Sequence, residues 1–240
     1  VAGGWLGRFL RYGGSTSARG ALAALALSRT MPESLRGAPA ATALEGIAGH
    51  AIVSSRRTQQ GDGYEAEVSV CGEFDGLIVR GRADGYDPRR QRVEEVKTFR
   101  GDLDSMPANR RALHWAQVQV YGALLCAERG LDEVELALVY FDVATQEETV
   151  LTERHAATSL QQLFEDRCRR FRDWAEQEAG HRRERDAGLE ALRFPHADFR
   201  PGQRPLSEAV YRTAAAGRCL MAQAPTGIGK TIGTLFPLLK

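Results

Sequence analysis

The chain has 240 residues, 43% of them hydrophobic and 26% charged, with a formal net charge of +1 at pH 7. This length allows one large domain or one domain and part of a second, and the balanced charge excludes a uniformly basic nucleic-acid-binding protein. No apolar run approaches the roughly 20 residues that a membrane helix needs, so we expect no membrane partner. Nucleic-acid contacts would have to come from local basic clusters, which are Arg56-Arg57, Arg89-Arg90-Arg92, Arg110-Arg111 and His181-Arg182-Arg183.

The four cysteines, at positions 71, 126, 168 and 219, contain no CxxC pair. Their spacing fits neither a zinc site nor an iron–sulfur cluster. We therefore expect free, buried thiols in a cytosolic protein.

The first ordered element is expected after residue 41, because residues 1–41 combine loop-like composition with weak patterning and predict a poorly ordered segment. Thr42 and Glu45 form a capping box, which predicts a helix from about residue 43 to between residues 54 and 57. His50 follows Gly46 by one turn on the same face, where a glycine lets another segment approach closely. A lone helical histidine is more often packed or solvated than a metal ligand.

Three antiparallel strands are predicted next, at residues 64–70, 74–82 and 92–99, with turns at 71–73 and 86–90. Asp84 ends the second strand. Glu95 and Lys97 share one face of the third strand, and Val96 points to the other. Asp84 and Glu95 could hold a divalent cation, and Lys97 could orient a water, as metal-dependent phosphodiester cleavage requires. The alternative is a solvated hairpin with weak ion pairs.

A helix is predicted over residues 108–129, with Pro107 at its start and Gly130 at its end. One polar stripe is formed by His114, Gln117 and Tyr121, and the apolar face by Leu113, Val120, Leu124 and Leu125. The stripe lies either along an active-site cleft or toward solvent. Two more strands, at 133–141 and 148–152, precede a packing helix that carries Leu160, Leu163, Phe164, Phe171 and Trp174. Residues 181–198 are interpreted as a linker.

Four ordered motifs resemble those of the PD-(D/E)xK nuclease superfamily, in the branch that includes the RecB nuclease domain. They are Gly46-Ile47-Ala48-Gly49-His50, Gly81-Arg82-Ala83-Asp84, Glu95-Val96-Lys97 and Gln117-Val118-Gln119-Val120-Tyr121. The resemblance implies an α/β, restriction-endonuclease-like fold over residues 42–180, with a mixed sheet flanked by helices. It also implies Mg²⁺ or Mn²⁺ held by His50, Asp84 and Glu95, with help from the Val96 carbonyl. Lys97 would be the catalytic lysine, and Gln117 and Tyr121 would support the site or touch DNA.

A second set of motifs lies near the C-terminus. A helix over 205–216 and an apolar strand over 219–222 lead to Ala224-Pro225-Thr226-Gly227-Ile228-Gly229-Lys230-Thr231 and a new helix. This order is typical of a phosphate-binding P-loop, although Ala224 replaces the first glycine of the general pattern. The loop, including Thr226, Gly227 and Gly229, would cradle the phosphates through its amides. Lys230 would reach the β- and γ-phosphates, and Thr231 would bind Mg²⁺.

The form APTGxGKT resembles the P-loop of superfamily 2 helicases of the DinG/XPD (Rad3-related) group. Arg200 and Gln203 resemble the Q motif with which those helicases read adenine. The resemblance implies ATP as a cofactor and residues 199–240 as the beginning of a RecA-like P-loop domain. It also implies two partners, which are single-stranded or forked DNA and the missing C-terminal helicase lobes of the same protein. The implied location is the bacterial cytoplasm, in association with the nucleoid. A Walker B strand and a second lobe are not present, so we expect no productive ATP hydrolysis by this chain.

The leading hypothesis is a metal-dependent DNA nuclease domain of an ATP-dependent, 5′-to-3′ DNA helicase that acts in repair or recombination. A second hypothesis keeps the nuclease fold as a DNA-binding or docking module without catalysis. A third treats the chain as an accessory domain of an ATPase, with no functional cluster at Asp84, Glu95 and Lys97.

Overall fold

The structure, a computed structural model, describes residues 10–11, 42–60 and 63–240. The chain divides into two compact units after Trp174. Apart from a two-residue strand, the segment 1–41, which was expected to be poorly ordered, lies outside the described residues. Each unit is built around its own packed elements.

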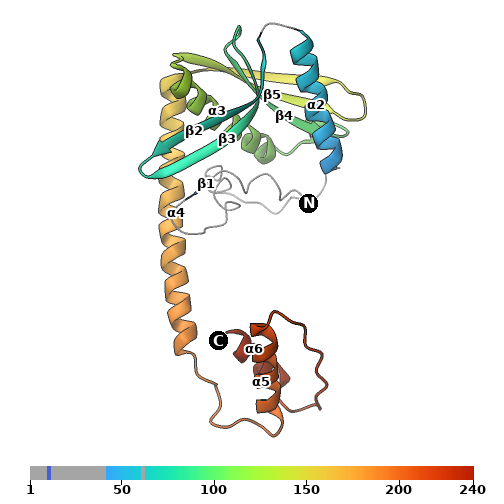
Figure 1. Ribbon diagram of the computed structural model, residues 1–240, viewed down its shortest axis with the longest axis vertical. Coiled ribbons are helices and arrows are strands. Elements are labelled where there is room, and N and C mark those ends of the chain that lie inside the picture. Colours follow the sequence, from blue (N-terminus) through green and yellow to red (C-terminus); the bar gives the residue numbers. More distant parts are fainter. Residues whose placement is uncertain (1–9, 12–41, 61–62) are drawn as a thin grey trace. The chain divides into compact units, whose positions relative to one another are not determined.

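A mixed six-stranded sheet forms the centre of the first unit (Figure 1). Its strands are β1 (Leu10–Arg11), β2 (Glu65–Phe74), β3 (Leu77–Asp87), β4 (Arg92–Phe99), β5 (Glu133–Asp142) and β6 (Glu148–Ala156). Neighbouring strands are antiparallel except β4 and β5, which run parallel. A parallel pair needs a crossover connection, and a helix supplies it here. The predicted fold class, a mixed α/β sheet flanked by helices, is confirmed.

Two helices cover opposite faces of β4, as its alternating side chains show. Glu94 and Val96 face α2 (Ala43–Gln59), where Arg57 and Val53 contact them. Lys97 faces the other way and contacts Gln117 of the crossover helix α3 (Ala108–Arg129). The short 3-10 helix η2 (Leu103–Ser105) lies in the loop before α3. The alternation predicted for β4 is therefore confirmed.

Helix α4 (Ala157–Ala191) begins directly after β6. Its buried residues in the first unit are Leu160, Phe164, Cys168 and Phe171. Helix α3 packs closely on the sheet at two glycines, because a Cβ on Gly72 of β2 would lie 2.4 Å from Leu124 of α3, and a Cβ on Gly122 of α3 would lie 2.5 Å from Leu136 of β5. Helix α4 continues through Ala191, so the first part of the predicted linker at 181–198 is helical. None of the described helices is both long and apolar enough to span a membrane.

Several local predictions need correction. The hairpin between β2 and β3 turns at Asp75 and Gly76, not at 71–73, because both residues have positive φ (50° and 76°) as the favoured two-residue turn requires. Strand β3 runs on through Asp87 instead of ending at Asp84. Two residues assigned to apolar faces are exposed, Leu113 by 40% and Leu163 by 37%.

The thiols also differ from expectation. All four cysteines are free, but Cys71 and Cys219 are exposed, and only Cys126 and Cys168 are buried as predicted.

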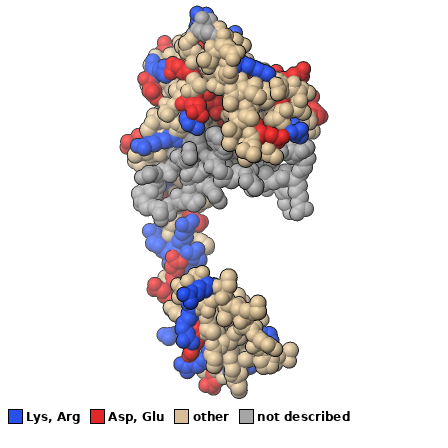
Figure 2. All heavy atoms as spheres, turned by 45° about the vertical axis from the view of Figure 1, so that its right-hand side comes forward, with Lys and Arg blue, Asp and Glu red and all other residues tan. Residues whose placement is uncertain are grey.

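Acidic and basic side chains are interspersed on the face seen in Figure 2, in agreement with the small net charge.

The second unit contains α5 (Gln203–Ala215) and α6 (Lys230–Leu238). Phe194 stacks on Phe199 with ring centroids 4.1 Å apart and meets Phe236 of α6 edge-on. The strand predicted at 219–222 is not formed: within the described part of the chain, residues 218–225 belong to no β-ladder, and Met221 is fully exposed. A strand needs a neighbouring strand for its backbone hydrogen bonds, and α5 and α6 provide none. The sheet of a RecA-like domain is thus absent among the described residues.

Candidate functional site

The site begins where β3 and β4 part. Their ladder pairs Asp87 with Arg92, Tyr86 with Val93 and Gly85 with Glu94, and there it ends. Beyond this fork, the edge of β4 is held by a side chain: Asp84 Oδ2 accepts a hydrogen bond from the Val96 amide at 2.7 Å. A backbone donor that would otherwise lack a partner is satisfied by a carboxylate.

Helix α2 brings His50 to this fork. The predicted capping box of Thr42 and Glu45 is present at its start. The close approach to the sheet occurs at Gly49 and not at Gly46, since a Cβ on Gly49 would lie 2.5 Å from the Thr98 side chain. His50 Nδ1 lies 3.1 Å from Asp84 Oδ1. Burial alone would lower the pKa of His50, but the Asp84 carboxylate outweighs it and the pKa is raised.

A chain of polar contacts runs from β4 to α3. Lys97 Nζ donates to Glu95 Oε1 at 2.5 Å and to Gln117 Oε1 at 3.0 Å. Gln117 Nε2 in turn donates to Tyr121 Oη at 3.0 Å. The structure therefore brings together all four residues that the sequence predicted for the catalytic face of β4 and α3.

Glu95 is the most strongly perturbed carboxyl group of the fork. It is only 3% exposed, and its Oε2 atom is buried without a hydrogen-bond partner among the described residues. Burial raises the pKa of Glu95, and the nearby Asp84 carboxylate adds to this, whereas Lys97 and His50 oppose it. A buried carboxylate oxygen without a protein partner can be satisfied either by a proton or by a bound cation.

The residues at the fork fit a hard divalent cation by the chemistry of their donor atoms. Within the described ranges, no three His, Cys, Asp or Glu side chains are grouped as a ready metal site. The predicted single cluster is present instead as two neighbouring contacts, His50 with Asp84 and Glu95 with Lys97. Mg²⁺ commonly uses one or two carboxylates and completes its shell with waters and substrate phosphates, so Asp84 and Glu95 would be the protein ligands of such an ion.

His114, the third member of the predicted stripe, has its hydrogen-bond partner on β5 and not in the Lys97–Gln117–Tyr121 chain of contacts. Its Nδ1 atom lies 2.9 Å from the Tyr140 hydroxyl. Burial lowers the pKa of His114 to about 3, and the charges of Lys97, Arg110 and Arg111 act in the same direction. His114 is therefore a neutral imidazole at physiological pH.

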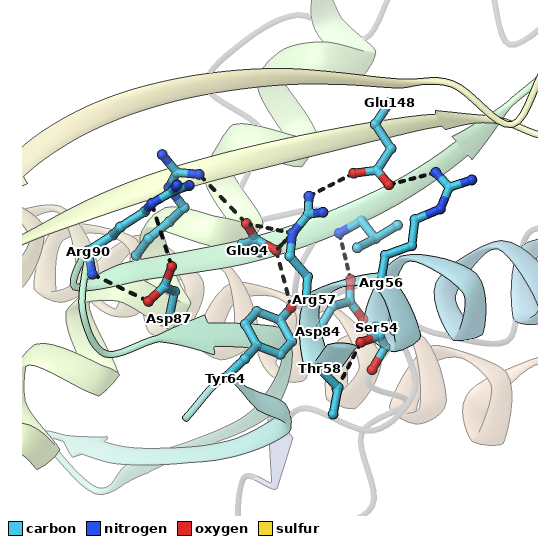
Figure 3. Close-up of polar contacts among 12 residues, drawn as sticks. Ser54, Arg56, Arg57, Thr58, Tyr64, Asp84, Asp87, Arg90, Glu94 and Glu148 are labelled. Atoms are coloured by element: carbon cyan, nitrogen blue, oxygen red, sulfur yellow. Dashed lines mark hydrogen bonds and ion pairs between the residues drawn. The ribbon is translucent and has the colours of Figure 1, made fainter. Parts of the chain in front are cut away.

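Arg56 and Arg57, one of the local basic clusters from which a nucleic-acid contact could come, form internal ion pairs (Figure 3). Arg57 contacts Glu94 and Glu148, and Arg56 contacts Glu148. Sequence reasoning missed Glu94. The available signal was its position on the same strand face as Val96, because a charged residue on a core-facing position requires a buried partner.

The glycine-rich loop of the second unit contains two glycines whose backbone lies in the left-handed region. Gly227 and Gly229 have φ values of 85° and 79°, which residues other than glycine rarely adopt. Lys230 is the first residue of α6, and its Nζ donates to the carbonyl groups of Ala224 and Pro225 at 3.1 and 2.9 Å. The Lys230 ammonium group thus lies against two carbonyl groups at the start of the loop.

Arg200 and Gln203 contact this loop directly. Gln203 is 1% exposed and donates to the Gly229 carbonyl at 3.0 Å, while its Oε1 accepts from the Arg200 amide at 3.1 Å. The Arg200 guanidinium donates to the Gly227 carbonyl at 2.6 Å. Both residues therefore hold the loop in place in this structure, and their predicted contact with adenine stays a prediction.

Comparisons with known proteins give weak likenesses. No protein-family model matches the sequence, and no curated protein matches it. The chain is similar to the crystal structure of SSO0001, with 22% identity, 52% of this chain and 59% of that chain covered, and a TM-score of 0.36. It is also similar to a phage-related exonuclease from Haemophilus somnus 129PT, with 14% identity, 70% and 84% of the two chains covered, and a TM-score of 0.41. The chain thus spans less than two thirds of the SSO0001 chain.

Proposed function

We propose that the first unit is a metal-dependent nuclease that cleaves phosphodiester bonds in DNA. One observation carries this proposal: Glu95 presents a buried carboxylate oxygen without a partner at the strand fork, next to the Asp84 carboxylate and the Lys97 ammonium. Two acids and a lysine at one point are the groups that such cleavage needs.

Each residue of the fork has a role in the proposed reaction. Asp84 and Glu95 would hold Mg²⁺ or Mn²⁺, which supplies a polarised phosphate and a bound water of lowered pKa. Lys97 would place its ammonium group beside the attacking water and the negative charge that develops on the phosphate. His50 holds Asp84 in orientation through its 3.1 Å contact and would be a further ligand.

Gln117 and Tyr121 support the lysine. The side-chain oxygen of Gln117 accepts from Lys97, and the Tyr121 hydroxyl accepts from the Gln117 amide. Burial raises the pKa of Tyr121, so its hydroxyl stays protonated. The relay fixes the direction of the Lys97 ammonium, which otherwise rotates freely on a flexible stem.

We further propose that residues 199–240 bind the phosphates of ATP and belong to a DNA helicase of the DinG/XPD type. The left-handed backbone of Gly227 and Gly229 would let the loop turn its amides toward phosphates, and Lys230 and Thr231 begin α6, whose N-terminus favours anions. In this context the helicase lobes would feed single-stranded or forked DNA to the nuclease during repair. Thr231 would bind the Mg²⁺ that accompanies ATP.

The nuclease proposal is tested by cleavage of a fluorescent single-stranded DNA with Mg²⁺ or Mn²⁺ added. We expect Lys97→Gln and Glu95→Gln to reduce the cleavage rate by about a hundredfold or more, the usual effect of losing one charge-stabilising group. Glu153→Gln is the matched control, because Glu153 is an exposed glutamate of β6 and should leave the rate unchanged.

Equal rates in all three variants would show that the cleavage comes from another source. Calorimetric titration with Mn²⁺ distinguishes the alternative of a docking module. A catalytic site predicts Mn²⁺ binding that is lost in Glu95→Gln, whereas a module that only binds DNA predicts no binding that depends on Glu95.

A further inference from the structure

Glu94 is a buried carboxylate that the proposed chemistry does not use. It is 1% exposed and precedes Glu95 on β4, on the opposite face of the strand. Its Oε2 atom accepts from Arg57 Nε and from the Tyr64 hydroxyl, both at 3.1 Å (Figure 3). A charge is buried at this depth only when it is paired, so the ion pair fixes α2 to β4.

Arg57 extends the same connection across the sheet. Its Nη2 donates to Glu148 of β6 at 2.7 Å, and Glu148 also accepts from Arg56 at 2.9 Å. Strand β5 lies between β4 and β6, so one guanidinium group joins two strands that are not neighbours. The end of α2 is thereby held at a defined position over three strands.

Tyr64 reaches Glu94 because Gly85 leaves room for its ring. A Cβ on Gly85 would lie 1.7 Å from the Tyr64 hydroxyl oxygen. Gly85 is also the residue of β3 that pairs with Glu94, and it follows Asp84 directly. The phenol therefore covers the last backbone pair before the two strands separate.

The Arg57–Glu94 pair lies where it can set the geometry of the site. Glu94 is the last residue of β4 that pairs with β3, and Glu95 is the first beyond the fork. Arg57 follows His50 by about two helical turns. Helix α2 thus contacts β3 through His50 and β4 through Arg57, the two strands that part at the site.

Stability alone gives little reason for such a pair, because buried ion pairs can often be replaced by apolar residues without loss. We propose that Arg57 and Glu94 are positioning residues of the nuclease site. They hold α2 and β4 so that His50 and Asp84 lie beside Glu95 and Lys97. This inference rests on the proposed nuclease function.

The test uses the double variant Arg57→Met/Glu94→Gln, which removes both charges and leaves neither one buried alone. We expect kcat to fall at least about tenfold with KM within about threefold, since alignment and not substrate binding is lost. We also expect the Val96 amide, whose partner is Asp84, to exchange with deuterium at least about tenfold faster. Arg56→Met is the matched control, an adjacent arginine that shares Glu148 but does not contact Glu94, and should change neither value.

The single variant Arg57→Met leaves the buried Glu94 carboxylate with only the longer Arg92 ion pair, at 3.9 Å, and the Tyr64 hydroxyl, and should lower the urea midpoint more than the double variant does. Wild-type kcat and wild-type Val96 exchange in a folded double variant would overturn the inference, as would equal losses in Arg56→Met. If the wild-type chain fails to cleave DNA, the proposed function fails, and Val96 exchange still decides whether the pair positions the fork.

Discussion

Asp84 of β3 holds the backbone of Val96 on β4, through a 2.7 Å hydrogen bond from the Val96 amide to its Oδ2 atom. The bond lies just beyond the last strand pair, Gly85 with Glu94. A candidate metal ligand therefore also sets the distance between the two strands that carry the acids. Substitutions of Asp84 can therefore affect the proposed metal binding and the spacing of β3 and β4 separately.

Asp84→Asn should separate the two roles. The Asn side-chain oxygen can still accept from Val96, so the unfolding free energy should change by about 1 kcal/mol or less. The lost charge should reduce the rate of DNA cleavage by about a hundredfold. Urea unfolding and single-turnover cleavage measure the two effects. Asp84→Ala also removes the acceptor and should cost about 1–3 kcal/mol more, and equal stability of both variants would contradict this role for the hydrogen bond.

Gly49→Ala should destabilise the first unit by about 1–3 kcal/mol, because the new Cβ would lie 2.5 Å from the Thr98 side chain and 3.0 Å from the Phe141 ring. Gly46→Ala is the matched control on the same helix. Its Cβ would meet only the Thr98 hydroxyl at 3.6 Å, so the better helix propensity of alanine should add about 0.5–1 kcal/mol. Thermal or urea unfolding of both variants gives the comparison, and a shift of the same sign in both would be inconsistent with the close approach.

Glu148 should make stability depend on acid pH. Burial alone would raise its pKa, but the hydrogen bonds and charges of Arg56 and Arg57 outweigh burial and lower the pKa below its ordinary value of 4.5. The contribution of Glu148 is therefore complete above pH 4.5 and is lost as the pH falls through the lower folded-state value. Glu148→Gln should cost about 1–3 kcal/mol at neutral pH, and the difference from wild type should shrink as the pH falls below 4.5. A difference that stays constant with pH would exclude an ionic contribution.

Lys230→Met should weaken binding of a fluorescent ATP analogue at least about tenfold, which corresponds to the loss of one charge-assisted hydrogen bond. The Lys230 ammonium now lies on the Ala224 and Pro225 carbonyl groups and would turn to the phosphates. Lys240→Met is the control, because Lys240 contacts the Glu190 carbonyl instead. Equal affinity in the two variants would argue against a phosphate site at this loop.

Much of the first unit could be predicted because its signals are local. The capping box at Thr42 and the Pro107 and Gly130 boundaries fix helix ends through residues a few positions apart. The shared face of Glu95 and Lys97 follows from strand alternation alone. Two short sequence signals gave wrong predictions, one because a stronger turn sequence lay close by and one because the predicted strand had no partner strand. Asp75-Gly76 was the stronger turn signal, and 219–222 found no strand to pair with.

The sequence predicted which side chains would meet at the fork but not the residues that support them, and the catalytic roles of those side chains stay predictions. Glu94 gains its role from Arg57 and Glu148, which come from other elements and lie far away in sequence. No local pattern specifies such partners, although the position of Glu94 on a core-facing edge indicates that a partner exists. Lysine usage was a further signal: lysine occurs only at positions 97, 230 and 240 among 32 basic Lys and Arg residues, and two of these three lie in the predicted sites.

The two exposed thiols offer a way to follow the whole chain at work. Cys71 belongs to the first unit and Cys219 to the second, while burial raises the pKa of Cys126 to about 11 and that of Cys168 to about 12. Maleimide dyes should therefore label one natural position in each unit and spare the other two, because the thiolate is the reactive form. Energy transfer between the dyes would then report how the separation of the two units responds to DNA and to nucleotide, without any engineered cysteine.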